Sequence, residues 1–253
     1  MTMLPRNSTS SRWILLAFCG FLFGCLPALA QEEDFLSEEA LFEEDLEEAP
    51  MVSDPLEPVN RVVFRFNDYA YTYVAEPVAD VYGLAPPTAR LGIRNFFNNL
   101  QYPVRLAGNL LQGRVDGAWL ETRRFAVNST IGLLGVLALA SGMEGLEKIE
   151  SEDVGQALGS WGLGEGPYLV LPFLGPSNLR DLGGLLADRS ANPWVLPFSV
   201  LESEARLVYS VGDGVSSLPG YLELYRQMKG SAIDPYSSLK NAFTQYRRSA
   251  IEK

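Results

Sequence analysis

The sequence contains no histidine, and its two cysteines, Cys19 and Cys25, lie in the first 30 of 253 residues. The lack of histidine removes Ser–His and Cys–His nucleophile pairs, and it also removes the commonest metal ligand. The rest of the chain has no cysteine nucleophile, disulfide or zinc cluster, and no G-x-S-x-G nucleophile elbow. An enzyme that acts through carboxylates or lysine is still possible, although the usual catalytic groups of hydrolases are missing.

Basic residues are few, and the acidic residues are unevenly distributed. Residues 31–53 hold ten acids and no base, whereas from Asp54 onward 21 acids face 18 bases, which leaves only −3 of the total charge of −11. The absence of a basic stripe argues against nucleic acid as a partner. Like charges at the density of residues 31–53 repel one another and do not nucleate a core. We expect this segment to be a disordered acidic linker, with a weak partner-binding helix as the alternative.

The first 30 residues have the pattern of an export signal. Two arginines precede an apolar run, 13–24, which is too short to span a bilayer. Two processing sites compete. The sequence ALA before Gln31 matches an A-x-A cleavage site, whereas LFGC resembles a bacterial lipobox in which Cys25 would be lipidated. The predicted boundaries are 1–30 for the signal peptide (1–24 with lipidation), 31–53 for the linker and 54–253 for the domain.

Helical periodicity dominates after the acidic linker. Apolar residues between Leu56 and Tyr73 step by three and four along one helical face, and Pro77 is predicted to end that helix. Together with the helices expected downstream, this pattern predicts a mainly α chain. Those helices are expected to begin at Thr88, to begin at Pro103, to cover 118–127, 182–188, 201–211 and 221–228, and to begin at Pro235.

The longest uncharged stretch of the predicted domain, 125–143, admits two interpretations. As a helix it would reach about 28 Å, close to the thickness of a hydrocarbon core. A run of Asn, Ser and Thr at 128–130 and several glycines interrupt it, however. Within it, residues 131–143 could form a buried helix of a soluble domain or a re-entrant helix that enters one leaflet.

Glycines, aromatic residues and prolines are concentrated in residues 153–181. Glycine permits backbone angles that a Cβ forbids, and proline interrupts helices and central strands. This composition predicts an irregular, largely apolar ribbon, either packed over a core or forming a surface that apolar molecules contact. The sequence Gly162-x-Gly164-x-Gly166 is not a dinucleotide fingerprint, because its spacing differs and Pro167 follows it.

Two groups of polar residues are candidate sites. Residues 60–67 alternate polar and aromatic side chains on a helix, so the polar face could bind other helices or line a wet cavity. Glu150, Glu152 and Asp153 could form a metal or acid–base site, although a solvated helix start is the simpler interpretation.

The order of short motifs along the chain resembles the MlaA (VacJ) family of bacterial outer-membrane phospholipid-transport lipoproteins. The resemblance covers about 200 of the 253 residues. Its most specific part is the ribbon, 153–181. The motifs are DPLEPVNR (54–61), FRFN (64–67), NSTIG (128–132), GQALG (155–159), GLGEGPY (162–168), LRD (179–181) and DPY (234–236).

This resemblance implies a single helical, ring-like, membrane-embedded domain with an amphipathic channel, on the periplasmic side of the outer membrane. Such proteins are thought to remove mislocalised phospholipids from the outer leaflet and pass them to a periplasmic lipid-binding shuttle, beside trimeric porins. Phospholipids, the outer membrane, the porins and the shuttle are the implied partners, and the resemblance implies a protein that is not an enzyme and that holds neither a metal nor a cofactor. The resemblance, the polarity of the helix and the glycine content together predict a lipid path formed by Asn60, Arg61, Phe64, Phe66, Asn67, Gly162, Gly164, Gly166 and Tyr168.

Two other functions are kept open, and the chain departs from the family in three places. The first alternative is an envelope scaffold that binds porins without transporting lipid; the second is a phospholipase acting through Glu150 or Asp153. Ser160 stands where many relatives carry a histidine, so the family pattern implies no role for a titrating side chain at this position. Phe23 is bulky for a lipobox, and the acidic linker is not part of the family pattern.

Overall fold

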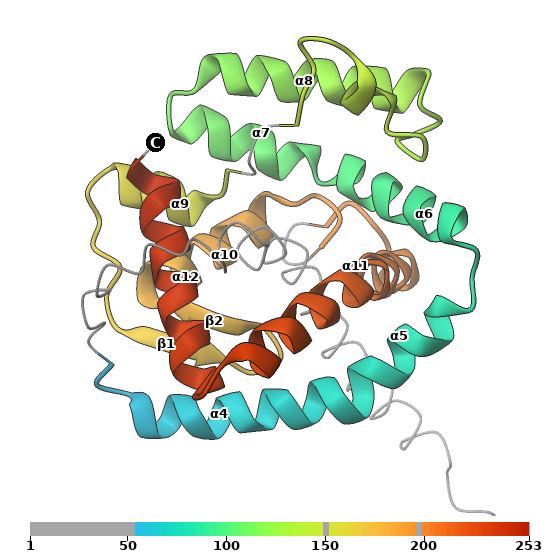
Figure 1. Ribbon diagram of the computed structural model, residues 1–253. Coiled ribbons are helices and arrows are strands. Elements are labelled where there is room, and N and C mark those ends of the chain that lie inside the picture. Colours follow the sequence, from blue (N-terminus) through green and yellow to red (C-terminus); the bar gives the residue numbers. More distant parts are fainter. Residues whose placement is uncertain (1–53, 149–151, 196–198, 253) are drawn as a thin grey trace, which may run out of the picture.

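The computed structural model describes residues 54–148, 152–195 and 199–252. The predicted signal peptide, Cys25, the acidic linker and Glu150 lie outside these residues, and the domain boundaries predicted there stay predictions. The described part is mainly helical (Figure 1), as the periodicity predicts.

The helices follow one another around a ring-like frame (Figure 1). Helices α4 (Glu57–Ala70), α5 (Glu76–Gly83) and α6 (Pro87–Leu100) form the lower and right sides. The paired helices α7 (Tyr102–Leu111) and α8 (Val115–Thr130) form the top, and α9 (Val154–Ser160) and α12 (Pro235–Glu252) form the left side. The long helix α11 (Ser203–Ser231) crosses the interior, where α10 (Leu179–Ala191) also lies. No helix in the described ranges is both long and apolar enough to cross a membrane.

The first helical run continues beyond Pro77, where the sequence predicts its end. A π-helical segment, η2 (Tyr71–Ala75), joins α4 to α5, and Pro77 lies in the first turn of α5. Proline is tolerated in a first helical turn because a backbone N–H at that position usually has no acceptor within the helix, so little is lost without it. The prediction of a helix end at Pro77 is therefore wrong.

Helix α11 is one helix rather than the two predicted at 201–211 and 221–228. Pro219 lies inside it. Leu218, Tyr221 and Leu222 are each 1% exposed, so packing of the buried face outweighs the local cost of proline. Gly212 is required by close packing, because a Cβ at that position would lie 2.5 Å from Cζ of Phe97 on α6.

Residues 131–148 form a series of tight turns with one 3-10 turn, η3 (Leu139–Gly142), so both helical interpretations of 131–143 are wrong. Leu133, Leu134 and Ala138 adopt positive φ angles of 55°, 59° and 46°. Asparagine side chains hold this backbone. Asn99 donates to Oγ of Ser129 and to the carbonyl of Leu134, and Asn128 accepts from the amide of Ala140.

The ribbon at 153–181 is more regular than the sequence predicts. It contains α9, an antiparallel hairpin of β1 (Tyr168–Leu171) and β2 (Gly175–Asn178), and the start of α10. Asp153 caps α9 by accepting from the amide of Gln156 at 2.7 Å, and Asn178 caps α10 by accepting from the amide of Asp181 at 2.8 Å. Only the connection at 161–167 is irregular. The two caps stabilise the starts of α9 and α10 although the segment is rich in glycine.

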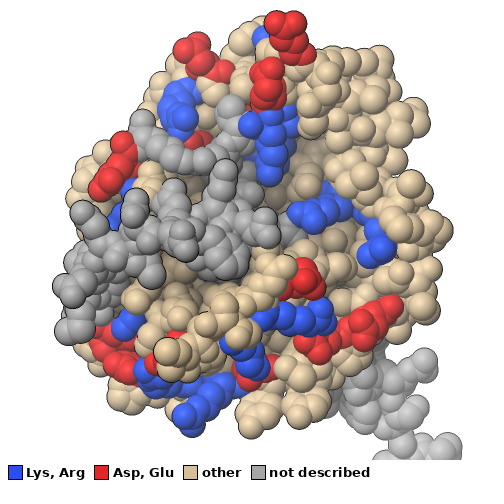
Figure 2. Space-filling model, in the orientation of Figure 1, with Lys and Arg blue, Asp and Glu red and all other residues tan. Residues whose placement is uncertain are grey.

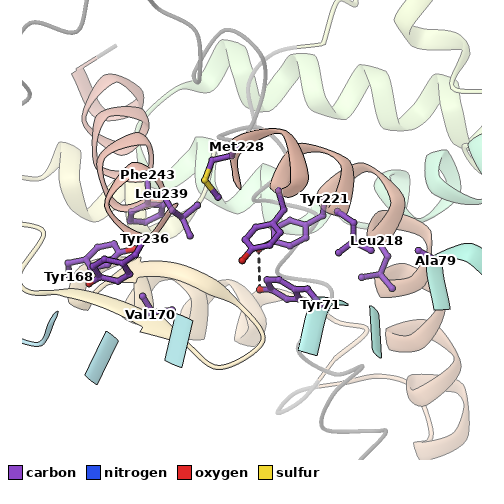
Figure 3. Packing of buried hydrophobic residues seen from close by; sticks show 12 residues of the cluster. Tyr71, Ala79, Tyr168, Val170, Leu218, Tyr221, Met228, Tyr236, Leu239 and Phe243 are labelled. Atoms are coloured by element: carbon purple, nitrogen blue, oxygen red, sulfur yellow. Dashed lines mark hydrogen bonds between the residues drawn. The ribbon is translucent and has the colours of Figure 1, made fainter. Parts of the chain in front are cut away.

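The apolar core lies where α11 and α12 pack over the hairpin and η2 (Figure 3). Its aromatic side chains form two groups. In one, the hydroxyl of Tyr221 donates to that of Tyr71 at 3.1 Å, and Tyr71 donates to the carbonyl of Phe173 at 3.2 Å. In the other, the rings of Tyr168 and Tyr236 meet edge to face at 6.2 Å. The core therefore fixes the hairpin from one side.

Candidate functional site

The fully buried residues of helix α4 are polar, and an apolar stripe lies on its exposed face. Asn60 and Asn67 are 3% and 2% exposed. The apolar residues of the outward stripe are between 46% and 71% exposed, and they step by three and four along one face: Val59, Val62, Phe66, Tyr69 and Tyr73. A helix of a soluble protein normally buries its apolar stripe, so this arrangement is inverted.

The same inversion recurs around the frame. On α8, Glu121, Arg124 and Asn128 are buried while Trp119 is 62% exposed. The turns that follow α8 expose Ile131, Leu133, Leu134, Val136 and Leu137. Figure 2 shows the corresponding broad uncharged area at the upper right, over α8 and the segment that follows it. Exposed apolar surface of this extent marks a surface that contacts another molecule or a membrane.

The two buried asparagines of α4 bind the backbone of the hairpin, an arrangement we call the asparagine clamp. Asn60 donates to the carbonyl of Tyr168 at 3.0 Å and accepts from the amide of Val170 at 2.9 Å. Asn67, two helical turns later, donates to the carbonyl of Leu171 at 2.9 Å and accepts from the amide of Phe173 at 2.7 Å. Each side chain thus pairs with β1 or its turn as a neighbouring strand would, and together they fix the register between α4 and the hairpin.

The tip of the hairpin presents an aromatic contact at the outer surface. Phe173 has a φ of 64°, a left-handed conformation that is rare for a bulky residue. Its ring meets that of Phe66 edge to face at 5.0 Å, and Phe66 is 46% exposed. The clamp therefore holds a strained turn against the exposed stripe of α4.

Arg61, Phe64 and Tyr168 converge on Tyr236 at the start of α12. The guanidinium of Arg61 lies 4.4 Å from the centre of the Tyr236 ring, and the Phe64 ring lies 5.8 Å from it. Arg61 also pairs with Asp234 at 2.8 Å. Hydrogen bonds from Arg61 and then Ser237 lower the pKa of Asp234 to about 2. These three predicted path residues thus connect α4 and β1 to the start of α12.

Gly162, Gly164 and Gly166, the three glycines of the predicted lipid path, lie in a stretch here called the glycine segment (162–166). Two of the three have open space where a side chain would lie. A Cβ on Gly162 or Gly164 would have no neighbour within 4 Å, although Gly162 has a φ of +88°. A Cβ on Gly166 would lie 3.0 Å from Cβ of Leu179. The adjacent Trp161 is 61% exposed.

The structure therefore divides the predicted path residues into two groups. Asn60, Asn67 and Tyr168 are buried, whereas Phe66 and the glycines are exposed. Arg61 and Phe64 are partly buried and belong to neither group. The role of all of them in a lipid path stays a prediction.

Sequence reasoning missed a buried ionic cluster formed by Arg247, Asp153, Asp181 and Asp188, here called the Arg247 cluster. Arg247 on α12 binds Asp153 through both Nη atoms at 2.6 and 3.0 Å, and its Nε donates to Asp181 at 2.8 Å. Burial alone would raise the pKa of Asp153, but the charge and hydrogen bonds of Arg247 outweigh burial and lower it. These groups are scattered in the sequence and alternate with apolar residues, so no local pattern identifies them.

The simpler interpretation of Glu152 and Asp153, a solvated helix start, is correct in that Asp153 caps α9, but it is wrong about the solvation. Glu152 is 4% exposed; it forms an ion pair with Arg114 and accepts from Gln112 at 2.6 Å. Asp153 belongs to the Arg247 cluster. Both acids are occupied by structural partners, and no group of three metal-ligating side chains is found in the described ranges.

Close helix packing explains the GQALG motif around the cluster. A Cβ on Gly155 would lie 2.7 Å from Nη2 of Arg247, and a Cβ on Gly184 would lie 2.3 Å from the backbone nitrogen of Gly155. The two glycines let α9 and α10 approach closely enough for both helices to reach Arg247.

Comparison with known proteins gives consistent results. The family model described as MlaA lipoprotein matches residues 52–250. The intermembrane phospholipid transport system lipoprotein MlaA of Escherichia coli K12 is 34% identical over 209 residues, with 76% of each chain covered. The protein of that name from Haemophilus influenzae is 30% identical, over 76% of this chain and 77% of its own.

A solved structure, reported as the structural basis for maintenance of bacterial outer membrane lipid asymmetry, is also similar. It superposes with a TM-score of 0.65 at 31% identity, covering 79% of this chain and 99% of its own. The inverted helices, the clamp and the glycine motifs thus occur in a chain that belongs to the MlaA lipoprotein family.

Proposed function

We propose that this protein removes mislocalised phospholipid from the outer leaflet of the bacterial outer membrane and delivers it to a periplasmic lipid-binding shuttle. The observation that carries the proposal is the inverted polarity of the frame, with buried asparagine and charged side chains and exposed apolar stripes. Relatives named as phospholipid-transport lipoproteins support the same function.

The physical requirement for such transport is a surface that serves both parts of a lipid. The outward stripe of α4 and the turns at 131–137 offer apolar surface to acyl chains without a membrane-spanning helix in the described part. Irregular backbone at membrane depth is tolerated where it is buried in protein or lines a cavity. The glycine segment and the clamped hairpin are the parts with which we expect the headgroup to come into contact.

The proposed environment is the periplasmic side of the outer membrane, with trimeric porins and the shuttle as partners. Transfer between sites makes and breaks no bond, so it requires none of the catalytic groups that the sequence lacks. A porin-bound scaffold remains the principal competing function, since it would use the same exposed apolar surface.

Cells that lack the gene provide the direct test. A membrane-impermeant amine reagent labels phosphatidylethanolamine only when this lipid is exposed at the cell surface. We expect labelling to rise in the deletion strain and to return to its original level with the intact gene. Unchanged labelling with a sound envelope would contradict transport and favour the scaffold.

Gly164→Val is expected to abolish this rescue while the protein accumulates normally. The position has open space and an ordinary φ, so valine adds bulk at the surface without strain, whereas Gly162→Val would be strained. Gly230→Val, which also places its side chain in open space, is the matched control and should rescue fully. Equal rescue by both variants would exclude the glycine segment from the lipid path.

Charges on the outward stripe are expected to weaken membrane binding. The double variant Val62→Asp/Tyr69→Asp alters side chains that are 65% and 64% exposed, so folding should be preserved. We expect roughly tenfold less flotation with phosphatidylethanolamine–phosphatidylglycerol vesicles, because binding scales with buried apolar area. Arg65→Glu, at an exposed position beside the stripe, is the control. Equal flotation of the stripe variant and wild type would show that α4 does not contact lipid.

A further inference from the structure

Helix α11 is joined to the corner between α6 and α7 by a contact that the proposed transport does not explain. Gln101 is the single residue between α6 and α7. Its side-chain nitrogen lies 3.3 and 3.2 Å from the two carboxylate oxygens of Asp213, in the middle of α11. The corner is therefore attached to the crossing helix through one amide and one carboxylate.

The surroundings of this contact are tightly packed. Phe97, at the end of α6, meets the ring of Tyr209 at 5.6 Å and lies against Gly212. Trp194 donates from its indole nitrogen to the carbonyl of Leu100 at 2.7 Å. Asp213 itself is 2% exposed. The interface between α11 and the α6–α7 corner is therefore closely packed, and ionisation of Asp213 places a charge inside it.

No cation compensates the carboxylate of Asp213 among the described residues. Tyr209, one turn earlier on α11, has its pKa raised by burial and then by the charge of Asp213. Arg105 on α7 also acts on Tyr209, but it is paired with Glu121 at 2.8 Å. From the α6–α7 corner, only the neutral Gln101 reaches Asp213, and no charged group of α5, α6 or α12 affects its ionisation.

We propose that Asp213 and Gln101 form a proton-controlled latch, in which protonated Asp213 keeps α11 against the α6–α7 corner and ionised Asp213 loosens this contact. A buried carboxylate with one neutral donor is poorly solvated, and opening of the interface admits the water that it lacks. Burial raises the pKa of Asp213 to about 7, opposed by the hydrogen bond from Gln101, so the change falls near neutral pH.

The closed state is expected to be less stable at neutral pH than in acid. Because the folded-state pKa lies above the unfolded value, the closed state holds a proton that the open state releases. The closed state therefore loses stability as pH rises from about 4 to about 7, and the loss is constant above that range. Asp213→Asn mimics the protonated form and removes this dependence.

Hydrogen exchange of the full-length protein in detergent tests the latch. We would measure the amides of 97–105 and 207–216, correct for intrinsic exchange, and divide the wild-type rate by that of Asp213→Asn. This ratio is expected to rise at least roughly tenfold between pH 5 and pH 8. Asp116→Asn, which alters an exposed acid on α8, should give a constant ratio.

A second variant keeps the test decisive if Asp213→Asn does not fold. Gln101→Met leaves Asp213 in place but removes its donor, and it should accelerate exchange at pH 8 more than at pH 5. A pH-independent ratio for both variants would overturn the proposal. So would a carboxyl carbon of Asp213 whose NMR shift titrates near pH 4.

Discussion

Replacement of Arg247 by leucine is expected to lower the free energy of unfolding by about 3–5 kcal/mol, the usual cost of removing one partner from a buried ion pair. The side chain of Arg247 is 8% exposed, and it is the cation shared by Asp153 and Asp181. Its loss leaves two buried carboxylates without that charge. Chemical denaturation of the purified protein followed by circular dichroism would measure the change.

The destabilisation by Arg247→Leu should shrink in acid. The lowered pKa of Asp153 means that its contribution is present above its unfolded value, about 4, and is lost as pH falls through the folded value. Asp188 acts in the opposite direction, because burial and then the charge of Asp153 raise its pKa to about 8. The difference between wild type and variant is therefore expected to be larger at pH 7.5 than at pH 4.

The neighbouring Arg248 supplies a matched control. It pairs with Glu165 at 2.7 Å, but the two side chains are 41% and 30% exposed. Arg248→Leu should therefore cost less than about 1 kcal/mol, as expected for a solvent-exposed pair. Equal costs for the two arginine variants would show that the Arg247 cluster does not determine the stability of the fold.

Asn67→Ala is expected to destabilise the protein by about 2–4 kcal/mol, because the carbonyl of Leu171 and the amide of Phe173 both lose their side-chain partner. Asn67→Asp tests the geometry as well. It can still accept from Phe173 but cannot donate to Leu171, so it should also be destabilised. Thermal unfolding measures both, with the exposed Asn241→Ala on α12 as the control.

The same variants separate stability from function. If the clamp positions the hairpin for lipid contact, Asn67→Ala should also reduce rescue in the amine-labelling assay at a temperature where it remains folded. Wild-type stability of both Asn67 variants would contradict the clamp as a structural element. Full rescue by a destabilised but folded Asn67→Ala would limit the clamp to a role in folding.

Helix existence was predictable from the sequence, but helix ends were not. Periodicity at 56–73 correctly predicted α4, yet Pro77 and Pro219 misled because each occurs where packing or a first turn accommodates it. The turns at 131–148 were also misread. The uncharged composition of residues 131–143 suits a helix, whereas the asparagine contacts that fix these turns come from residues up to 35 positions away.

The motifs that form the candidate site could be recognised in the sequence, but the contacts that their side chains make could not be predicted from it. The residues at 60–67 and 162–168 were recognised through polarity, glycine content and family pattern. The pairing of Asn60 and Asn67 with backbone more than a hundred residues later follows from tertiary structure alone. The Arg247 cluster likewise joins positions 66 and 94 residues apart, and neither spacing has a local signature.

The place of α12 in the frame has a consequence for the order of assembly. Just before its start, Asp234 accepts from Arg61 of α4, and in its first turn Tyr236 donates to Asp54, which precedes α4. Its far end joins α9 and α10 through Arg247. A chain made from its N-terminus acquires these bonds last, since long-range closure waits for the final helix. A chain truncated before Pro235 would retain each earlier helix but could not join the two sides that α12 connects. We expect such a chain to be an open arc that proteases degrade more readily than the full-length protein.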